Sequence, residues 1–283
     1  MSRIGLARPR ASARRALGRL RGEGPATLLL LLLAGLGLAF FGLPILGLVL
    51  RVPWEGALAR LTRPTTLDAL RLSLLASLWA TALALTFGFP LAWLLARCEF
   101  PGRAWLRALV MLPMVLPPVV AGVALLTAFG RRGLLGPWLS ARGVELPFST
   151  AGAVLAATFV AAPFLVVTLE AGLSSADWRL EEAAASLGAS RWMILRTVTL
   201  PALRPSILAG AALAWARALG EFGATITFAG NLAGRTRTLP LAVFQALQSD
   251  PDAAVLLGAL LMAVSLAVLV ALRGQLLGGP ARG

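Results

Sequence analysis

Residues 177–201, DWRLEEAAASLGASRWMILRTVTLP, interrupt a chain that otherwise consists of long apolar runs. Four charged residues stand close together at the start of this stretch: Asp177, Arg179, Glu181 and Glu182. Burying that many charges in a bilayer core would be costly, so we place the stretch between membrane spans. From the pattern alone, an interfacial amphipathic loop is an equally good interpretation.

Local signals predict two short helices joined by a turn. Ser174 and Asp177 mark the start of the first helix, and Gly188 ends or bends it. Ser190 is the expected cap of a second helix, which Pro201 is expected to close. The pattern predicts a polar elbow, residues 174–201, outside the membrane.

The first elbow helix is amphipathic. Leu180, Ala184 and Leu187 share one face, and Arg179 and Glu181 point away from that face. We therefore expect one apolar and one charged side on this helix.

The elbow resembles the EAA loop of ABC importer permeases. The resemblance rests on residues 182–184, Glu-Ala-Ala, followed by Gly188 and by Leu200-Pro201, with Val198 where isoleucine is usual. In that family the loop docks into a cleft on a cytoplasmic ATPase and carries its movement into the membrane. The resemblance assigns this coupling role to Glu181, Glu182, Ala183, Ala184, Gly188, Ala189, Trp192, Leu200 and Pro201.

The composition is that of a membrane protein. The 283 residues are 58% hydrophobic and 13% charged, and the mean hydropathy is +0.83. The net charge of +14 comes from arginine alone, and the arginines lie between apolar runs. This favours the positive-inside rule over nucleic-acid binding. The absence of histidine excludes a His-based metal site or proton relay, and a single cysteine, Cys98, excludes an intrachain disulfide.

The apolar runs predict an all-α membrane protein with six transmembrane helices. The predicted spans are residues 26–50, 72–96, 108–129, 150–169, 206–229 and 253–272. Further expected segments are an arginine-rich N-terminus at 1–25, a polar loop at 51–71 broken by Pro53 and Pro64, a transmembrane permease domain at 67–273, and a tail at 274–283. The run at 26–50 competes with a signal peptide, but it is longer than a signal core.

Six spans place both termini on one side of the membrane. That side also has residues 97–107 and the elbow, and it has more arginines than the opposite side. The positive-inside rule therefore predicts that both termini and the elbow are cytoplasmic. It places Cys98 inside and the 131–148 loop outside.

Two spans contain residues that are unusual at membrane depth. Pro113, Pro117 and Pro118 remove backbone donors within the third span, which indicates either an ordinary kinked helix or a lining of the transport pathway. Arg217 and Glu221 stand four apart in the fifth span, where charges normally face a bundle interior or water. A pair that only stabilises the helix near the outer interface is the alternative.

Small and polar residues surround this charged pair. Gly220 and Gly223 allow close helix approach or a break, and Thr225, Thr227 and Asn231 offer donors suited to an oxyanion or are ordinary interfacial residues. The candidate pathway and gate residues are Pro117, Pro118, Arg217, Glu221, Gly223, Thr225, Thr227 and Asn231.

A narrower resemblance covers most of residues 90–245, in order. RCEFPGRA, LPMVLPPVVAG, FGRRGLLG, ARALGEFGATITFAGN and RTRTLPLAVF are similar to stretches of molybdate ABC transporter permease subunits. The resemblance implies import of molybdate across a prokaryotic plasma membrane by a homodimer of this chain, with two cytoplasmic ATPase subunits and an extracytoplasmic molybdate-binding protein. Sulfate, tungstate and other oxyanions are alternatives. The arginine-rich N-terminus and the first span are additions that the shortest members of that family lack.

The sequence has no G-x-x-x-x-G-K-[ST] phosphate loop. We expect ATP and magnesium on the partner ATPase, and no cofactor, metal or catalytic residue on this chain. A proton-coupled secondary transporter using Glu170 and Glu221 is a rival, against which the lack of matching broken helices in inverted halves would count. A membrane scaffold is a second rival, which would need no polar groups at depth.

Overall fold

The computed structural model describes residues 25–277, with side chains from 26 to 270, and every regular element in this range is helical. The chain divides into two compact units, Met1–Val52 and Pro53–Gly283. The first contributes α2 (Pro25–Leu50), an apolar helix that agrees with the predicted first span. The predicted arginine-rich terminus lies outside the described residues up to position 24, as does the predicted tail from position 278.

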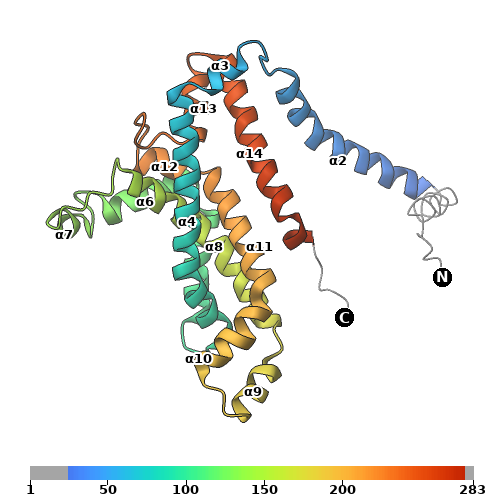
Figure 1. Ribbon diagram of the computed structural model, residues 1–283, viewed down its shortest axis with the longest axis vertical. Coiled ribbons are helices and arrows are strands. Elements are labelled where there is room, and N and C mark those ends of the chain that lie inside the picture. The colour runs from blue at the N-terminus through green and yellow to red at the C-terminus, as the bar shows by residue number, and fades with distance from the viewer. Residues whose placement is uncertain (1–24, 278–283) are drawn as a thin grey trace, which may run out of the picture. The chain divides into compact units, whose positions relative to one another are not determined.

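The second unit contains the remaining helices, labelled in Figure 1. They are α3 (Ala57–Leu61), α4 (Pro64–Arg97), α5 (Arg103–Val115), α6 (Pro118–Phe129), α7 (Gly136–Ser140), α8 (Thr150–Ser175), α9 (Trp178–Ser186), α10 (Arg191–Ile194), the π-helical turn η1 (Leu195–Thr199), α11 (Leu200–Leu219), α12 (Gly223–Phe228), α13 (Leu239–Leu247) and α14 (Pro251–Leu277).

The start of α4 corrects the predicted polar loop at 51–71. The short helix α3 lies within that range, and α4 begins at Pro64 rather than near residue 72. Proline is favoured in the first helical turn, where its missing N–H would have no partner. Arg63 has the extended backbone that a residue before proline prefers.

The core of the second unit is built by α4, α8 and α11. Small residues of α8, among them Ala157 and Ala161, are buried in it. Gly88 of α4 lies so close to α8 that a Cβ there would be 2.9 Å from the Leu165 side chain. Trp215 of α11 donates a hydrogen bond from Nε1 to Ser77 Oγ of α4, at 2.8 Å. Such close approach over small residues is typical of helices packed within membranes.

The helices α4 and α8 run parallel. Trp79 lies beside Leu155, and Gly88 lies against Leu165, so positions later in α4 meet positions later in α8. The chain between them must therefore cross the membrane once more. The only apolar segment long enough within that connection is α5 together with α6.

The third span is broken, which corrects the prediction of one helix over 108–129. The axes of α5 and α6 differ by 120°, and the break lies at Leu116-Pro117, where Leu116 is extended before proline and Pro118 opens α6. Pro113 stays inside α5. Counting this pair as one crossing gives six candidate spans over the described residues.

The fifth span also departs from the predicted 206–229. The helical segment counted as this span runs from Arg191 through Pro201 to Leu219, so Pro201 does not close the second elbow helix. The π-helical turn η1 lies directly before it. This wider turn is where the hydrogen-bond ladder accommodates the missing N–H of proline. At the other end, residues 220–222 interrupt the helix before α12.

Candidate functional site

The elbow has the predicted helix–glycine–helix form. Asp177 caps α9 by accepting a hydrogen bond from the Arg179 N–H, at 3.1 Å. Gly188 has a φ of +85°, a left-handed conformation that favours glycine. Ser190 caps α10 through the Met193 N–H, at 3.3 Å. The elbow is therefore two capped helices with one defined turn.

One charged side chain of α9 faces the rest of the chain, whereas the large apolar side chains of this helix and its cap face outward. Leu180 is exposed, and Leu187 is 89% exposed. Glu181 instead contacts α4 and η1. An ordinary surface helix directs its apolar stripe to the core. The inverted arrangement indicates that the apolar side is covered by another molecule.

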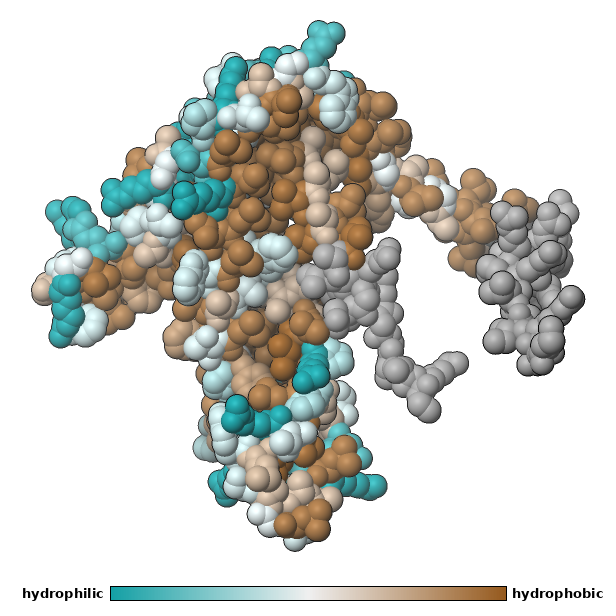
Figure 2. Space-filling model, in the orientation of Figure 1, coloured by the Kyte–Doolittle hydropathy of each residue, from teal (hydrophilic) through white to brown (hydrophobic). Residues whose placement is uncertain are grey.

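The outward apolar surface of the elbow includes residues from both of its helices. Its exposed members are Trp178, Leu180, Leu187, Trp192 and Met193. Figure 2 shows brown atoms at the lower tip of the molecule, where Figure 1 places α9 and α10. Of the other predicted coupling residues, Glu182 and Ala183 are also exposed, whereas Leu200 and Pro201 lie half-buried at the start of α11.

One carboxylate oxygen fastens the elbow to the helices above it. Oε1 of Glu181 accepts a hydrogen bond from Arg97 Nη2 at 3.1 Å and another from Thr199 Oγ1 at 3.0 Å. We call these three residues the Glu181 clasp. Glu181 is among the predicted coupling residues but neither partner is, because Arg97 is 84 positions away and no local pattern connects the two.

At the other end of α11, the predicted Arg217–Glu221 pair is confirmed. Glu221 Oε2 lies 2.6 Å from Arg217 Nη1, and the two side chains are 1% and 27% exposed. Glu221 Oε1 also accepts a hydrogen bond from the Ala224 N–H, at 2.8 Å. The cation therefore lies in the last turn of α11 and the anion at the start of α12, which complements both helix dipoles. The pair stabilises a break, not a continuous helix.

The helix α12 packs against α6, which brings most of the predicted pathway residues together. A Cβ at Gly223 would lie 2.5 Å from Pro118 Cβ, and a Cβ at Gly122 would lie 2.5 Å from Thr227 Cβ. Thr225 is buried in α12. The two broken spans thus meet at their breaks, with Pro117 at the entry to α6.

The predicted donors are largely occupied within the chain. Thr227 donates its hydroxyl to the Gly223 carbonyl at 2.9 Å. Asn231 is not in the α6–α12 contact: Oδ1 accepts from Arg237 Nε at 2.8 Å, and Nδ2 donates to Gln245 Oε1 at 3.3 Å. The carboxylate of Glu221 already accepts the Ala224 N–H in the first turn of α12.

An ion pair between α5 and α8 was not predicted. Arg107 of α5 donates from Nε to Glu170 Oε1 of α8 at 2.9 Å, and its Nη2 also contacts that oxygen. Glu170 is buried. This pair fixes α5 to α8 and leaves Glu170 bound to a permanent cation, which disfavours the proton-carrier role. Two spans are broken, the third and the fifth, but they do not occupy equivalent positions in two halves of three spans.

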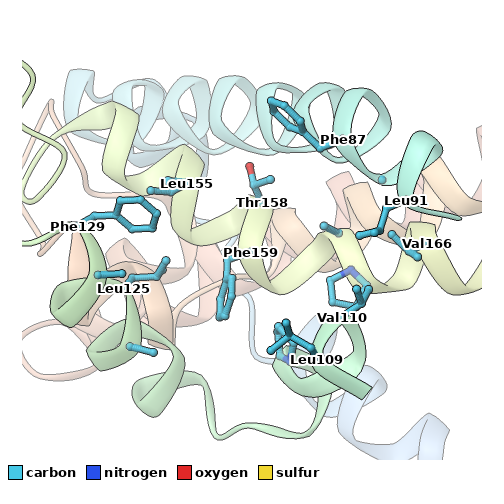
Figure 3. Close-up of a pocket in the computed structure, with 16 residues that line it drawn as sticks. Phe87, Leu91, Leu109, Val110, Leu125, Phe129, Leu155, Thr158, Phe159 and Val166 are labelled. Carbon is cyan, nitrogen blue, oxygen red and sulfur yellow. The ribbon is translucent and has the colours of Figure 1, made fainter. Parts of the chain in front are cut away.

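A cavity of about 450 Å³ lies among α4, α5, α6 and α8. Its lining is apolar apart from the Thr158 hydroxyl, as Figure 3 shows. That hydroxyl is donated to the Val154 carbonyl, at 2.7 Å. A dianion would lose its hydration there without gaining charged partners, so this cavity does not suit an oxyanion. Among the residues with described side chains, no His, Cys, Asp and Glu cluster could hold a metal ion.

Comparison with known proteins agrees with this architecture. Residues 84–277 match the family described as "Binding-protein-dependent transport system inner membrane component". The chain is 46% identical over 234 residues to the molybdenum transport system permease protein ModB of Mycobacterium tuberculosis, which covers 83% of this chain and 89% of that one. It is 38% identical over 231 residues to the sulfate transport system permease protein CysT of Escherichia coli, with 80% and 83% covered.

A solved structure has the same fold. The crystal structure of a bacterial ABC transporter involved in the import of the acidic polysaccharide alginate superposes with a TM-score of 0.70, at 21% identity, over 92% of this chain and 98% of that one. The family match over residues 84–277 shows that the chain belongs to the inner membrane components of binding-protein-dependent transport systems, and its fold is that of an ABC transporter permease.

Proposed function

We propose that this chain is the membrane-spanning permease subunit of an ATP-driven importer that carries molybdate into the cytoplasm. The observation that carries the substrate assignment is the 46% identity to a molybdenum permease over 83% of the chain, against 38% to a sulfate permease. Tungstate is the nearest alternative, because it is also a tetrahedral dianion of similar size. Sulfate is the next alternative.

The proposed assembly contains two copies of this chain, two cytoplasmic ATPase subunits and an extracytoplasmic molybdate-binding protein. The outward apolar surface of the elbow supports docking of the ATPase, since five large apolar side chains there are more than half exposed: Trp178, Leu180, Leu187, Trp192 and Met193. ATP and magnesium belong to that ATPase in this proposal. This chain supplies no catalytic group and performs transport only.

The pathway assignment follows from the meeting of the two broken spans. We infer that the α6–α12 contact is the gate and that Arg217 and Glu221 hold its geometry. Arg217 is the arginine in the last turn of α11, next to the gate, and the carboxylate of Glu221 largely neutralises its charge. A passing anion would therefore meet dipoles and hydroxyls more than a free cation.

The test of function is uptake of labelled molybdate by proteoliposomes that contain this chain and its ATPase, with the binding protein outside and ATP at the ATPase. We expect ATP-dependent uptake that unlabelled tungstate competes with and a large excess of sulfate does not. Omitting the binding protein is the control, and uptake should then be lost. Equal competition by sulfate would reassign the substrate.

Orientation is a separate prediction. The positive-inside rule places the elbow in the cytoplasm and the 131–148 loop outside. Ser140 of that loop is exposed, so Ser140→Cys in a Cys98→Ser background gives one reactive thiol. A membrane-impermeant maleimide added to intact cells should label it, whereas Ser186→Cys in the same background should react only after the membrane is opened. The reverse pattern would invert the topology.

A further inference from the structure

The elbow helix α9 has few attachments to the membrane helices. None of its residues is buried. Within the part of the chain whose side chains are described, Glu181 makes the only side-chain polar contacts from α9 to another element of the second unit. Its two ends are the extended Ala176-Asp177 joint and the left-handed Gly188. Apart from these two chain connections and the packing of α9 beside α10 and η1, the specific link from α9 to the bundle is Glu181.

The partners of Glu181 are the ends of two long helices. Arg97 is the last residue of α4, and Thr199 is the last residue of η1, directly before α11. Thr199 is buried, and Arg97 makes no other side-chain hydrogen bond within the described chain. A single oxygen thus joins three elements at the elbow side of the bundle.

Both α4 and α11 lead away from the clasp: α11 ends beside the gate, and the far part of α4 lies against α13. A hydrogen bond from Trp215, near the end of α11, to Ser77 joins the two helices, and Figure 1 shows them side by side above the elbow. Ser73 of α4 accepts a hydrogen bond from the Leu239 N–H at 2.6 Å, on the opposite side from the elbow. At that side α11 ends at Leu219, next to the break that contains Glu221.

We propose that Glu181 is a positioning residue for transport, which passes displacement of the elbow to α4 and α11 together and so to the gate. The proposal rests on the proposed function, because it requires a partner that moves the elbow. The Arg97 and Glu181 side chains are 21% and 28% exposed, so their ion pair contributes little to folding stability. The role of the pair is to keep these elements in position. Without the clasp, α9 moves with the ATPase, but α4 and α11 do not move with α9.

The experiment compares the complete transporter carrying Glu181→Gln with the wild type in proteoliposomes. The measured quantity is molybdate accumulated per ATP hydrolysed. We expect this ratio to fall about fivefold or more in the variant, in the range of ordinary coupling between sites, while ATP hydrolysis and co-purification with the ATPase persist. Arg97→Gln combined with Glu181→Gln should be no worse than Glu181→Gln alone, since both remove the same ion pair.

Two further variants separate coupling from folding. Thr199→Val keeps the shape of a buried side chain and the Arg97–Glu181 pair, so it should lower the ratio less than Glu181→Gln does. Glu145→Gln is the matched control. It removes an Arg131–Glu145 contact of 2.8 Å between exposed side chains on the opposite side, and it should leave the ratio unchanged.

A second measurement does not depend on molybdate. Hydrogen exchange is followed in the elbow and in residues 219–224, with and without ATP. Both regions should respond in the wild type, and in Glu181→Gln only the elbow should respond. The proposal is wrong if residues 219–224 respond equally in the variant, if they do not respond in the wild type, or if transport per ATP is unchanged. A wild type that responds but takes up no molybdate would overturn the proposed substrate and leave the clasp supported.

Discussion

One glycine forms the elbow turn and another opens α12 directly after the α11–α12 break, and the two are required for different reasons. Gly188 has a φ of +85°, and a Cβ there would meet nothing within 4 Å. Gly223 has no left-handed backbone, but a Cβ there would lie 2.5 Å from Pro118. The first position needs the backbone freedom of glycine, and the second needs its small volume. Glycine is therefore needed for its backbone conformation at one position and for its size at the other.

Glu181, in the helix before Gly188, and Glu221, just before Gly223, also differ. Glu221 is buried and pairs with a residue four positions before it. Glu181 is partly exposed and pairs with residues from two other elements. A buried local pair fixes the shape of one segment, whereas an exposed long-range pair connects segments. The largest energetic penalties are therefore expected at the gate, and the largest effects on coupling are expected at the elbow.

The largest expected effect is that of Glu221→Gln, which leaves Arg217 without its anion. Breaking a fully buried pair costs about 3–5 kcal/mol, and the 27% exposure of Arg217 lowers that figure here. Transport should fall strongly, and thermal unfolding of the purified permease should move to lower temperature. Adding Arg217→Gln should restore part of both, because an unpaired buried charge is worse than a missing pair.

The double variant also tests the alternative role of Arg217. If Arg217 bound the anion directly, removing it as well would be at least as damaging as either single change. Uptake by the two single variants and the double variant decides between these roles. An absence of any recovery in the double variant would refute the structural role of the pair.

The contrast between these pairs also explains what the sequence was able to predict. The Arg217–Glu221 contact follows from helical spacing, and the caps Asp177 and Ser190 follow from local hydrogen-bonding chemistry. Both are properties of short segments. The Arg97–Glu181 and Arg107–Glu170 contacts join residues 84 and 63 positions apart, and no spacing rule specifies which distant helices will meet.

The broken spans were only partly predictable. Prolines at 113, 117 and 118 indicated a disturbance of the third span, but not a bend of 120°. The residues on both sides of Leu116-Pro117 are apolar, so hydropathy does not change at the break. The mean hydropathy of residues 108–129 therefore predicts a single span. The π-helical turn before Pro201 has no hydropathy signal either, and the helix therefore seemed to end where it continues.

The next effect concerns the space at the gate. Gly223→Ala forces a methyl group into contact with Pro118, and overpacking of this kind costs about 1–3 kcal/mol. We expect lower thermal stability and reduced uptake. Gly220→Ala is the matched control, because its Cβ would lie 3.7 Å from the nearest atom, at ordinary contact distance. Equal loss in both variants would mean that flexibility, not space, is needed here.

At the elbow, a pair of substitutions at Gly188 tests the backbone conformation and not the available space. Gly188→Val places a β-branched residue in the left-handed region, at a cost of about 1–2 kcal/mol. Gly188→Asn is tolerated there, since asparagine visits this region readily. The valine variant should insert normally in the membrane but lose ATPase association and uptake, and the asparagine variant should retain most of both. Normal uptake and association by the valine variant would show that the turn is not required.

The smallest expected effect on the folded chain is that of Leu187→Ser. Leu187 is 89% exposed, so its removal should leave the thermal unfolding of the isolated permease unchanged. If a partner covers it, as the outward apolar surface of the elbow suggests, about 1.4 kcal/mol of lost burial would weaken ATPase association tenfold. Leu134→Ser is the matched control, with 88% exposure in the 131–148 loop. Titration of detergent-solubilised permease with the ATPase measures both. Equal affinities would place the ATPase contact elsewhere, because the two leucines differ only in the side of the molecule from which they project.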